Sequence, residues 1–299
     1  MKTYESLFRN YKGQASGTIF AHFYPITLSP AAQPIGEDYD RPFAQIAALT
    51  IDGTSAWGFQ QQRFKSKHSY SAVPKLKNYL NYTFKRLLEM EQSAPGLYFS
   101  VSADGKWISF NTGLQNPHCA DLLAIFQRYE SRPDSPPRPD WVYKGCYTPN
   151  ESLYRNHFGT QVPDIASYST DSRDFVFDAS YRLEKDAFDH LLDRAKLRAG
   201  LPNATDEVVR TYLRGAIENL VPKIRRNYKV AIPVYYVEEK RMQLLLPFAS
   251  VTEANNMSCF LIERDDSIKS YRLKTIFDLD QAYFSARLIT RPDKDWLDP

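Results

Sequence analysis

Apolar residues recur at intervals of three and four in several stretches of the chain, which is the spacing of one helix face. The clearest stretch, residues 74–92, begins at Pro74, and proline is favourable at the first position of a helix. Its apolar stripe comprises Val73, Leu76, Leu80, Phe84 and Leu87. The same spacing predicts helices over residues 4–11, 119–129, 184–200, 204–221 and 278–289. Thr205 and Asp278 are suited to cap the last two, and Gly200 to end the helix before them.

Strand-like runs alternate with turn residues elsewhere. Residues 97–110 form two such runs around Ala103–Lys106, and the second strand is expected to end at Phe110, before the polar Asn111–Gly113. Further strands are expected over residues 17–28, 141–149, 174–178, 227–237, 242–248, 258–265 and 270–277. Loops are expected over 29–42 and the proline-rich 131–140, whereas 43–53 fits a helix or a strand. This order predicts an α+β fold, with a mainly antiparallel sheet built from hairpins and several packed helices.

Composition limits the class of protein. Of the 299 residues, 43% are hydrophobic, which is enough for a substantial core, and 20 Tyr and 18 Phe supply rings for packing or stacking. The net charge of +3 permits an anionic partner without pointing to one. The cysteines form no CxxC pair, and we find neither a signal peptide's apolar core nor a run of membrane-spanning length. We therefore expect a reduced, cytoplasmic protein that uses no cofactor, metal or membrane; its oligomeric state stays open.

Polar and aromatic residues also follow helical spacing on the segment 74–92. They are Tyr79, Tyr82, Thr83 and Arg86. Two interpretations fit: the tyrosines stack on bases while the arginine pairs with a phosphate, or the tyrosines pack beneath a sheet. Asn111–Gly113 likewise fits either an anion-binding concavity of backbone N–H groups or an Asx-type turn.

The densest basic run of the chain is Lys223–Lys229, which is expected to lead into a strand. A basic stripe beside aromatic residues suits a phosphate backbone, but a charged run is also typical of a solvated face. In the last predicted helix, Asp280 and Arg287 lie two turns apart and could bracket a ligand or join a polar network. Asp278 has the position of a helix cap, and no third carboxylate has matching spacing, which argues against a two-metal site.

Catalytic signatures such as GxSxG, HExxH, a Walker loop or GxGxxG are absent from the sequence. Metal-independent phosphodiester chemistry would require two histidines that converge as acid and base. The candidates for this alternative are His118, His157 and His190.

Five ordered motifs resemble one family. They are LKNYLNYTFKRL (76–87), FNTGL (110–114), KVAIPVYY (229–236), QLLLPF (243–248) and TIFDLDQAYFSARLITRPDKDWL (275–297). They resemble the bacterial and fungal family of domain of unknown function 3825, which is often fused to OST-HTH (LOTUS) and cold-shock-like OB modules. The resemblance leaves residues 1–54 as an N-terminal extension of unclear structure before a family domain over 55–299. Val234 and Ser285 replace the family's usual glutamine and asparagine, so a shared ligand would be bound differently at these positions.

The resemblance implies RNA or nucleotide binding, in RNA processing or defence, because OST-HTH and OB modules bind RNA. The residues of this chain that agree with the family's motifs are mostly polar or aromatic, which favours one shared polar site. The expected ligand-binding residues are Tyr79, Tyr82, Thr83, Arg86, Asn111, Thr112, Gly113, Lys229, Tyr235, Tyr283 and Arg287. Arg86, Lys229 and Arg287 would bind phosphate. Tyr79 and Tyr82 would stack on bases, and Asn111–Gly113 would donate hydrogen bonds to a phosphate or a base edge. The alternatives are the phosphodiesterase or nucleotidyl-processing enzyme and a protein-interaction module whose aromatic motifs form its core.

Overall fold

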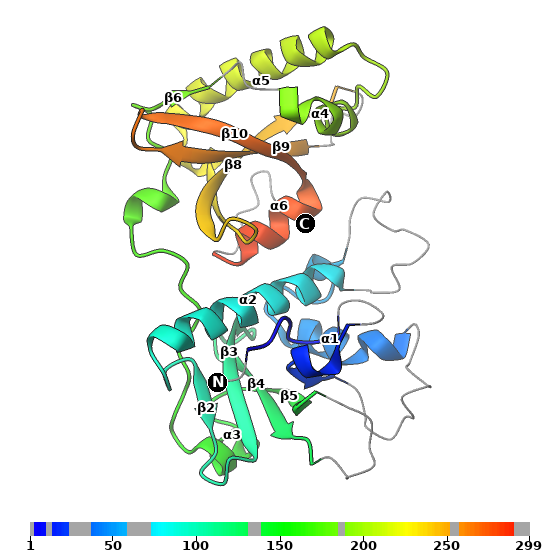
Figure 1. Ribbon diagram of the computed structural model, residues 1–299, viewed down its shortest axis with the longest axis vertical. Coiled ribbons are helices and arrows are strands. Elements are labelled where there is room, and N and C mark those ends of the chain that lie inside the picture. Colours follow the sequence, from blue (N-terminus) through cyan, green and yellow to red (C-terminus); the bar gives the residue numbers. More distant parts are fainter. Residues whose placement is uncertain are drawn as a thin grey trace. The chain divides into compact units, whose positions relative to one another are not determined.

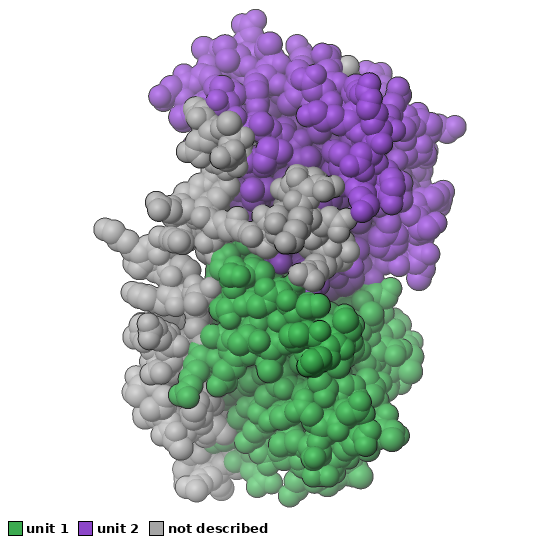
Figure 2. Space-filling model, turned by 180° about the vertical axis from the view of Figure 1, so that it is seen from behind, with its two compact units in different colours: residues 1–167 green, residues 168–299 purple. Residues whose placement is uncertain are grey.

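A computed structural model divides the chain into two compact units, residues 1–167 and 168–299, which Figure 2 colours separately. The residues that the structure describes are 3–9, 14–23, 37–58, 73–130, 139–184, 189–251 and 257–289. Each unit contains a five-stranded sheet in which one parallel strand pair accompanies antiparallel pairs (Figure 1). Helices pack on both sheets, and the predicted α+β class is confirmed.

The first unit has its strands in the order β1, β5, β4, β3, β2. They are β1 (Ala21–His22), β5 (Trp141–Tyr147), β4 (Asp121–Arg128), β3 (Trp107–Gln115) and β2 (Phe99–Val101). The helices of this unit are α1 (Glu37–Leu49), α2 (Pro74–Ser93) and α3 (Ser152–Phe158), and short 3-10 turns occur at Ser16–Thr18 and Ser55–Trp57.

Phenylalanine rings fill the space between α2 and this sheet. The Phe84 ring of α2 lies 4.7 Å from the Phe20 ring and 5.6 Å from the Phe110 ring, centroid to centroid. Phe110 in turn stacks at 5.5 Å on Phe126. Because Phe20 precedes residue 55, part of the predicted N-terminal extension contributes to the core of the first unit. Helix α3 covers the other face of the sheet, where its Tyr154 is fully buried.

The second unit has its strands in the order β6, β10, β9, β8, β7. They are β6 (Arg182–Leu183), β10 (Ser270–Asp278), β9 (Met257–Asp265), β8 (Arg241–Ala249) and β7 (Ile232–Tyr236). The helices are α4 (Leu192–Arg198), α5 (Asp206–Arg226) and α6 (Leu279–Arg287), and 3-10 turns occur at Ser172–Phe175, Asp189–Leu191 and Tyr228–Val230.

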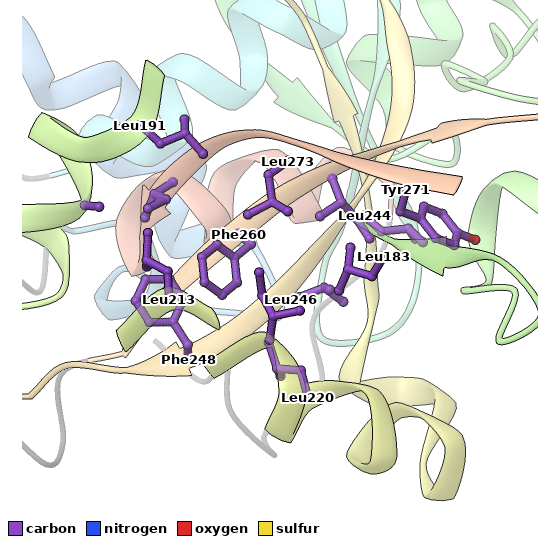
Figure 3. Packing of buried hydrophobic residues seen from close by; sticks show 14 of the residues in the cluster. Leu183, Leu191, Leu213, Leu220, Leu244, Leu246, Phe248, Phe260, Tyr271 and Leu273 are labelled. Carbon is purple, nitrogen blue, oxygen red and sulfur yellow. The ribbon is translucent and has the colours of Figure 1, made fainter. Parts of the chain in front are cut away.

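Alternate residues of β8 face two different cores. Leu244 and Leu246 belong to the large cluster that also contains Leu213 and Leu220 of α5 (Figure 3). Leu245 belongs instead to the cluster formed with α6. Because successive strand residues point to opposite faces, the sheet of the second unit is covered by α4 and α5 on one face and by α6 on the other.

The sequence correctly predicted helix α2 and the hairpin β2–β3 of the first unit, and helices α5 and α6 with two hairpins of the second. The helix predicted over 184–200 is shorter, because α4 begins at Leu192 after a 3-10 turn. Helix α2 begins at Pro74 as expected. The two hairpins β7–β8 and β9–β10 are antiparallel and turn where the charged residues predicted it. The side chains of Thr205 and Asp278 accept hydrogen bonds from the backbone N–H groups of Val208 and Gln281, and so cap α5 and α6.

The predicted helix over 119–129 is wrong, because these residues form β4. This strand lies in the middle of its sheet, and Leu122–Phe126 are all buried. A strand covered on both faces has a continuous apolar run, which periodicity alone does not distinguish from a helix.

The predicted helix over 4–11 is also wrong over its described part. Ser6 forms a parallel bridge with Ile19, and the Phe20 N–H donates to the Ser6 carbonyl oxygen at 2.9 Å. Pairing with a distant segment therefore overrides the local helical spacing.

Two further segments differ from prediction. The expected loop over 29–42 contains the start of α1, with Pro42 inside the helix, whereas 43–49 continue that helix. The expected strand over 174–178 is absent, because Ser172–Phe175 form a 3-10 turn capped by Asp171. The predictions for 10–13, 24–36, 131–138 and 290–297 lie outside the described residues.

Candidate nucleic-acid interface

The expected site residues are divided between the two units. Those of the first unit are Tyr79, Tyr82, Thr83, Arg86, Asn111, Thr112 and Gly113; those of the second are Lys229, Tyr235, Tyr283 and Arg287. The single shared site predicted from the sequence draws on both units and stays a prediction.

Asn111–Gly113 form a bulge inside β3, so the predicted end of this strand at Phe110 is wrong. The strand continues to Gln115, and its pairing with β4 is irregular between Asn111 and Gln115. Gly113 has a φ of 71°, in the left-handed region that favours glycine. An inserted residue of this kind bends a strand without ending it.

The polar groups of this bulge bond within the protein. The Asn111 side-chain oxygen accepts from the Gly113 N–H at 3.0 Å, and its amide donates to Asp121 at 3.0 Å. The Thr112 hydroxyl donates to the Leu122 carbonyl oxygen at 2.6 Å and accepts from the Leu114 N–H at 3.2 Å. These bonds satisfy the groups that were expected to donate to a phosphate or base, which favours the Asx-type turn.

Tyr79 connects α2 to the bulge. Its ring is buried, and its hydroxyl donates to the Thr112 carbonyl oxygen at 3.0 Å. A Cβ atom on Gly113 would lie 2.7 Å from the Tyr79 hydroxyl oxygen, closer than real Cβ contacts allow. Glycine is therefore required here by both backbone conformation and space, and the Tyr79 ring is packed instead of presented for stacking.

The remaining candidates on α2 differ in burial and in their partners. Thr83 is buried and Tyr82 is partly buried. The Arg86 guanidinium donates to the Ser167 carbonyl oxygen at 2.7 Å and lies 3.4 Å from Glu89. This arginine supports the segment that follows α3.

Three candidates of the second unit are buried near α6. Tyr283 belongs to the apolar cluster that also contains Val234, so the family's usual glutamine position is here part of a core. Tyr235 and Arg287 are 4% and 8% exposed, respectively. Burial to this degree limits how much of these side chains a ligand reaches.

The start of α6 is tied to α4 by a buried ion pair. Asp278 is fully buried, caps α6 and pairs with Arg198. Burial, with the Asp278 carboxylate as a second cause, raises the pKa of the neighbouring Cys259 thiol. The motif residue Asp278 thus joins two helices across the end of β10.

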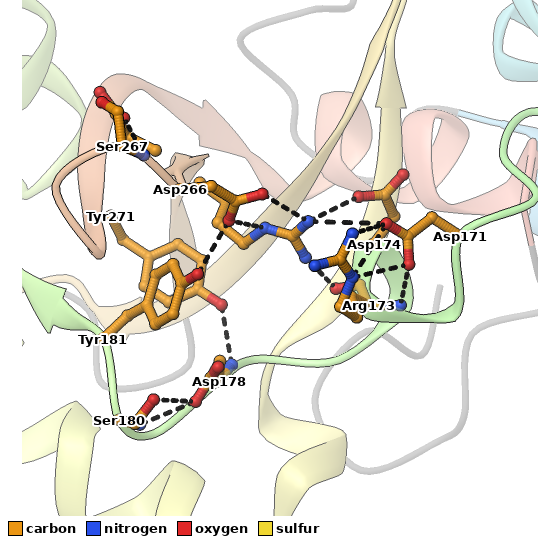
Figure 4. A network of polar contacts seen from close by, with 11 residues as sticks. Asp171, Arg173, Asp174, Asp178, Ser180, Tyr181, Asp266, Ser267 and Tyr271 are labelled. Atoms are coloured by element: carbon orange, nitrogen blue, oxygen red, sulfur yellow. Dashed lines mark hydrogen bonds and ion pairs between the residues drawn. The ribbon is translucent and has the colours of Figure 1, made fainter.

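A network of charges fixes the connection that enters the second unit (Figure 4). Arg264 of β9 contacts Asp266 at 2.8 Å and also lies near Asp171 and Asp174, at 3.8 and 3.6 Å. Hydrogen bonds from the Arg173 side chain and backbone are the main causes that lower the pKa of Asp171 to about 2. The cations of this network therefore have carboxylate partners within the unit.

The basic run has a different environment at the C-terminal end of α5. Lys223, Arg225 and Arg226 occupy the last turn of this helix and are exposed. The expected strand at Lys229 is wrong, because the helix is followed by a 3-10 turn that contains this exposed lysine. Among the described residues, neither Lys223 nor Arg225 has an ion-pair partner. We call residues 223–229 the basic segment.

Tyr228 lies among these cations, and 63% of it is exposed. Among the side chains that the structure describes, no other aromatic residue reaches the exposed class. The expected site contained Lys229 but omitted this tyrosine. Periodicity could not have identified it, because Tyr228 lies four residues after Ile224, the spacing of the buried α5 stripe.

The candidates for catalysis are dispersed. The His157 ring stacks on Trp107 at 3.8 Å, and His118 lies exposed in the turn between β3 and β4. No hydrogen bond or ring contact joins these two histidines within the described ranges, and the His190 side chain lies outside them. Burial raises the pKa of the Cys146 thiol to about 12, so it stays protonated at neutral pH.

The described part of the chain has neither a metal-binding cluster nor a membrane-spanning helix. It contains no group of three or more His, Cys, Asp or Glu side chains placed to hold a metal ion. None of its helices is long and apolar enough to cross a membrane.

Comparison with models of protein families gives a match over most of the chain. The model of a domain of unknown function (DUF3825) matches residues 53–296, a range that includes the first four motifs and nearly all of the fifth. No curated protein and no solved structure matches the chain. Because the family model covers most of the sequence, the chain belongs to the DUF3825 family.

Proposed function

We propose that this protein binds RNA, and that the basic segment supplies the phosphate contacts. The supporting observation is the exposure of Lys223, Arg225, Arg226 and Lys229 within a short stretch at the end of α5. Lys and Arg side chains that neutralise phosphates release counterions, which provides most of the affinity for nucleic acid that does not depend on sequence.

Stabilisation of the helix is a second reason to find cations at this position. The C-terminal end of a helix has a partial negative charge, and each nearby cation stabilises it by about 0.3–1 kcal/mol. This effect accounts for basic residues in the last turn of α5, but it does not account for the exposed Tyr228. An anionic partner with flat rings accounts for both.

RNA is favoured among anions because the family's domain is expected to be fused to RNA-binding modules in other proteins. The location we propose is the cytoplasm. Cys119, Cys146 and Cys259 are free thiols, which suits a reducing compartment.

The test measures the binding of a labelled, unstructured RNA of about ten nucleotides by fluorescence anisotropy over a range of salt concentrations. Affinity should fall as salt rises. The triple variant Lys223→Gln/Arg225→Gln/Arg226→Gln should bind more weakly, and its slope of log affinity against log salt should be shallower by about 2, since each lost phosphate contact on a single strand contributes about 0.7.

A matched control separates local contacts from net charge. Arg225→Gln and Arg173→Gln each remove one exposed positive charge from the second unit, but Arg173 already pairs with Asp171. Only Arg225→Gln should weaken RNA binding. Equal effects of the two variants, an affinity indifferent to salt, or binding to anionic phospholipid vesicles without binding to RNA would each contradict the proposal.

A further inference from the structure

The Tyr228 side chain is presented outward from a backbone that is itself well fixed. The Asn227 N–H donates to the Lys223 carbonyl oxygen at 2.9 Å, and the Lys229 N–H donates to the Asn227 side-chain oxygen at 3.1 Å. The Ala231 N–H donates to the Tyr228 carbonyl oxygen at 3.2 Å. Exposure of the ring is therefore not a consequence of a loose loop.

Buried residues hold this turn on both sides. Ile224, four residues before Tyr228, and Ala231, three residues after it, are 3% and 4% exposed and belong to the large core cluster of the second unit. Residues 225–229 between these two anchors are all exposed. A ring in this place is available to a ligand at little cost in conformational entropy, because its backbone is already ordered.

We infer that the basic segment binds single-stranded RNA in preference to duplex, with the Tyr228 ring stacked on an unpaired base. The inference rests on the proposed function and specifies the substrate class of the same site. In an A-form duplex the faces of internal bases are covered by their neighbours, so an aromatic side chain meets phosphates, 2′-hydroxyls and base edges but no internal base face. In a single strand each base has a free face, and aromatic stacking contributes regardless of base identity.

The cations and the ring have separate roles in this arrangement. Lys223, Arg225 and Arg226 act on phosphates, which both forms of RNA contain. Tyr228 acts on a base face, which every base of the single strand offers and which the internal bases of a duplex do not. Loss of the ring should therefore alter the preference between the two forms, and loss of the cations should weaken binding to both.

The experiment compares a labelled single strand with the blunt duplex of the same sequence and length, at one salt concentration, for the wild type, Tyr228→Ala and Tyr228→Phe. The wild type should prefer the single strand. Tyr228→Ala should weaken single-strand binding by about five- to hundredfold and leave duplex binding and the salt slope unchanged. Tyr228→Phe keeps the ring and should bind as the wild type does.

An abasic strand with the same number of phosphates provides an independent check. It should bind to the wild type and to Tyr228→Ala with equal affinity, because the stacking partner is missing. This inference would be overturned if the wild type bound single strand and duplex with equal affinity, or if Tyr228→Ala lost the same affinity for both. In that case salt-dependent binding of RNA would leave the proposed function intact. Absence of RNA binding by the wild type would overturn both.

Discussion

The bulge at Asn111–Gly113 and the basic segment at the end of α5 are both rich in polar groups beside a tyrosine. In the bulge, the amide of Asn111 and the hydroxyls of Thr112 and Tyr79 bond to protein oxygen atoms at 2.6–3.0 Å. In the basic segment, the charged groups and the Tyr228 ring face solvent. A tyrosine therefore stabilises the fold in one region and has an exposed ring in the other.

This difference gives a rule for interpreting the motifs of the family. A recurrent asparagine, threonine or tyrosine marks a binding site only if its hydrogen bonds are not already made within the protein. Buried polar groups must be satisfied, and leaving one without a partner costs about 1–3 kcal/mol. The need to satisfy buried hydrogen bonds therefore fixes the residue type at a motif position as strongly as contact with a ligand does.

The largest expected effect is on Gly113. Gly113→Ala should lower the free energy of unfolding by about 2–3 kcal/mol, because it adds strain at a positive φ to a clash with the Tyr79 hydroxyl. Urea unfolding measures this loss, and the RNA affinity of the folded fraction should not change.

The control for Gly113→Ala removes the hydroxyl that causes the clash. In a Tyr79→Phe background the nearest remaining ring atom lies 4.0 Å from the added Cβ, an ordinary contact. The cost of Gly113→Ala should then fall to about 1–2 kcal/mol from the backbone alone. Equal costs in the two backgrounds would show that the close approach of Tyr79 does not matter.

Thr112→Val should have the next largest effect. Valine has nearly the same shape but removes the hydroxyl that bonds to the Leu122 carbonyl oxygen and the Leu114 N–H. We expect a loss of about 1–3 kcal/mol in unfolding free energy. Thr112→Ser keeps the hydroxyl and should be clearly more stable than Thr112→Val; the reverse order would argue against a structural role for this group.

A smaller effect, dependent on pH, is expected for Asp171, a carboxylate that already has cationic partners. Its pKa is lowered to about 2 in the folded protein, so its contribution to stability is complete above its unfolded pKa of about 3.9 and is lost as pH falls through about 2. Asp171→Asn should therefore destabilise the protein at pH 6 and have little effect near pH 2, as measured by urea unfolding. An NMR midpoint for this carboxyl near 3.9 would contradict the paired arrangement in Figure 4.

The smallest expected effect on stability is at the basic segment itself. Arg226→Gln should change the free energy of unfolding by no more than about 0.5 kcal/mol, because an exposed cation at a helix end contributes only a weak dipole interaction. A loss of several kcal/mol in thermal or urea unfolding would show that Arg226 stabilises the fold, as the residues of the bulge do.

The sequence was informative wherever local chemistry decides the structure. Pro74, Thr205 and Asp278 marked helix starts, and charged turns marked the hairpins of the second unit. It was misleading where distant parts of the chain decide. Residues 119–129 became a strand because both faces are covered by the rest of the fold.

The candidate site shows the same division. The sequence singled out Lys229 and the basic run, since a cluster of charged residues can be recognised without the structure. It did not reveal that Tyr79 bonds to Thr112, because a hydrogen bond between residues 33 positions apart depends on how α2 packs on β3. Nor did it distinguish the exposed Tyr228 from the many buried tyrosines of this chain.

Ultraviolet cross-linking of a single-stranded RNA, followed by mass spectrometry of the peptides, maps directly where RNA touches the protein. Cross-links should occur in the peptide that contains Tyr228 and should be lost in Tyr228→Ala. Cross-links concentrated at Asn111–Gly113 or Tyr79, with none at the basic segment, would rule out RNA binding at the basic segment.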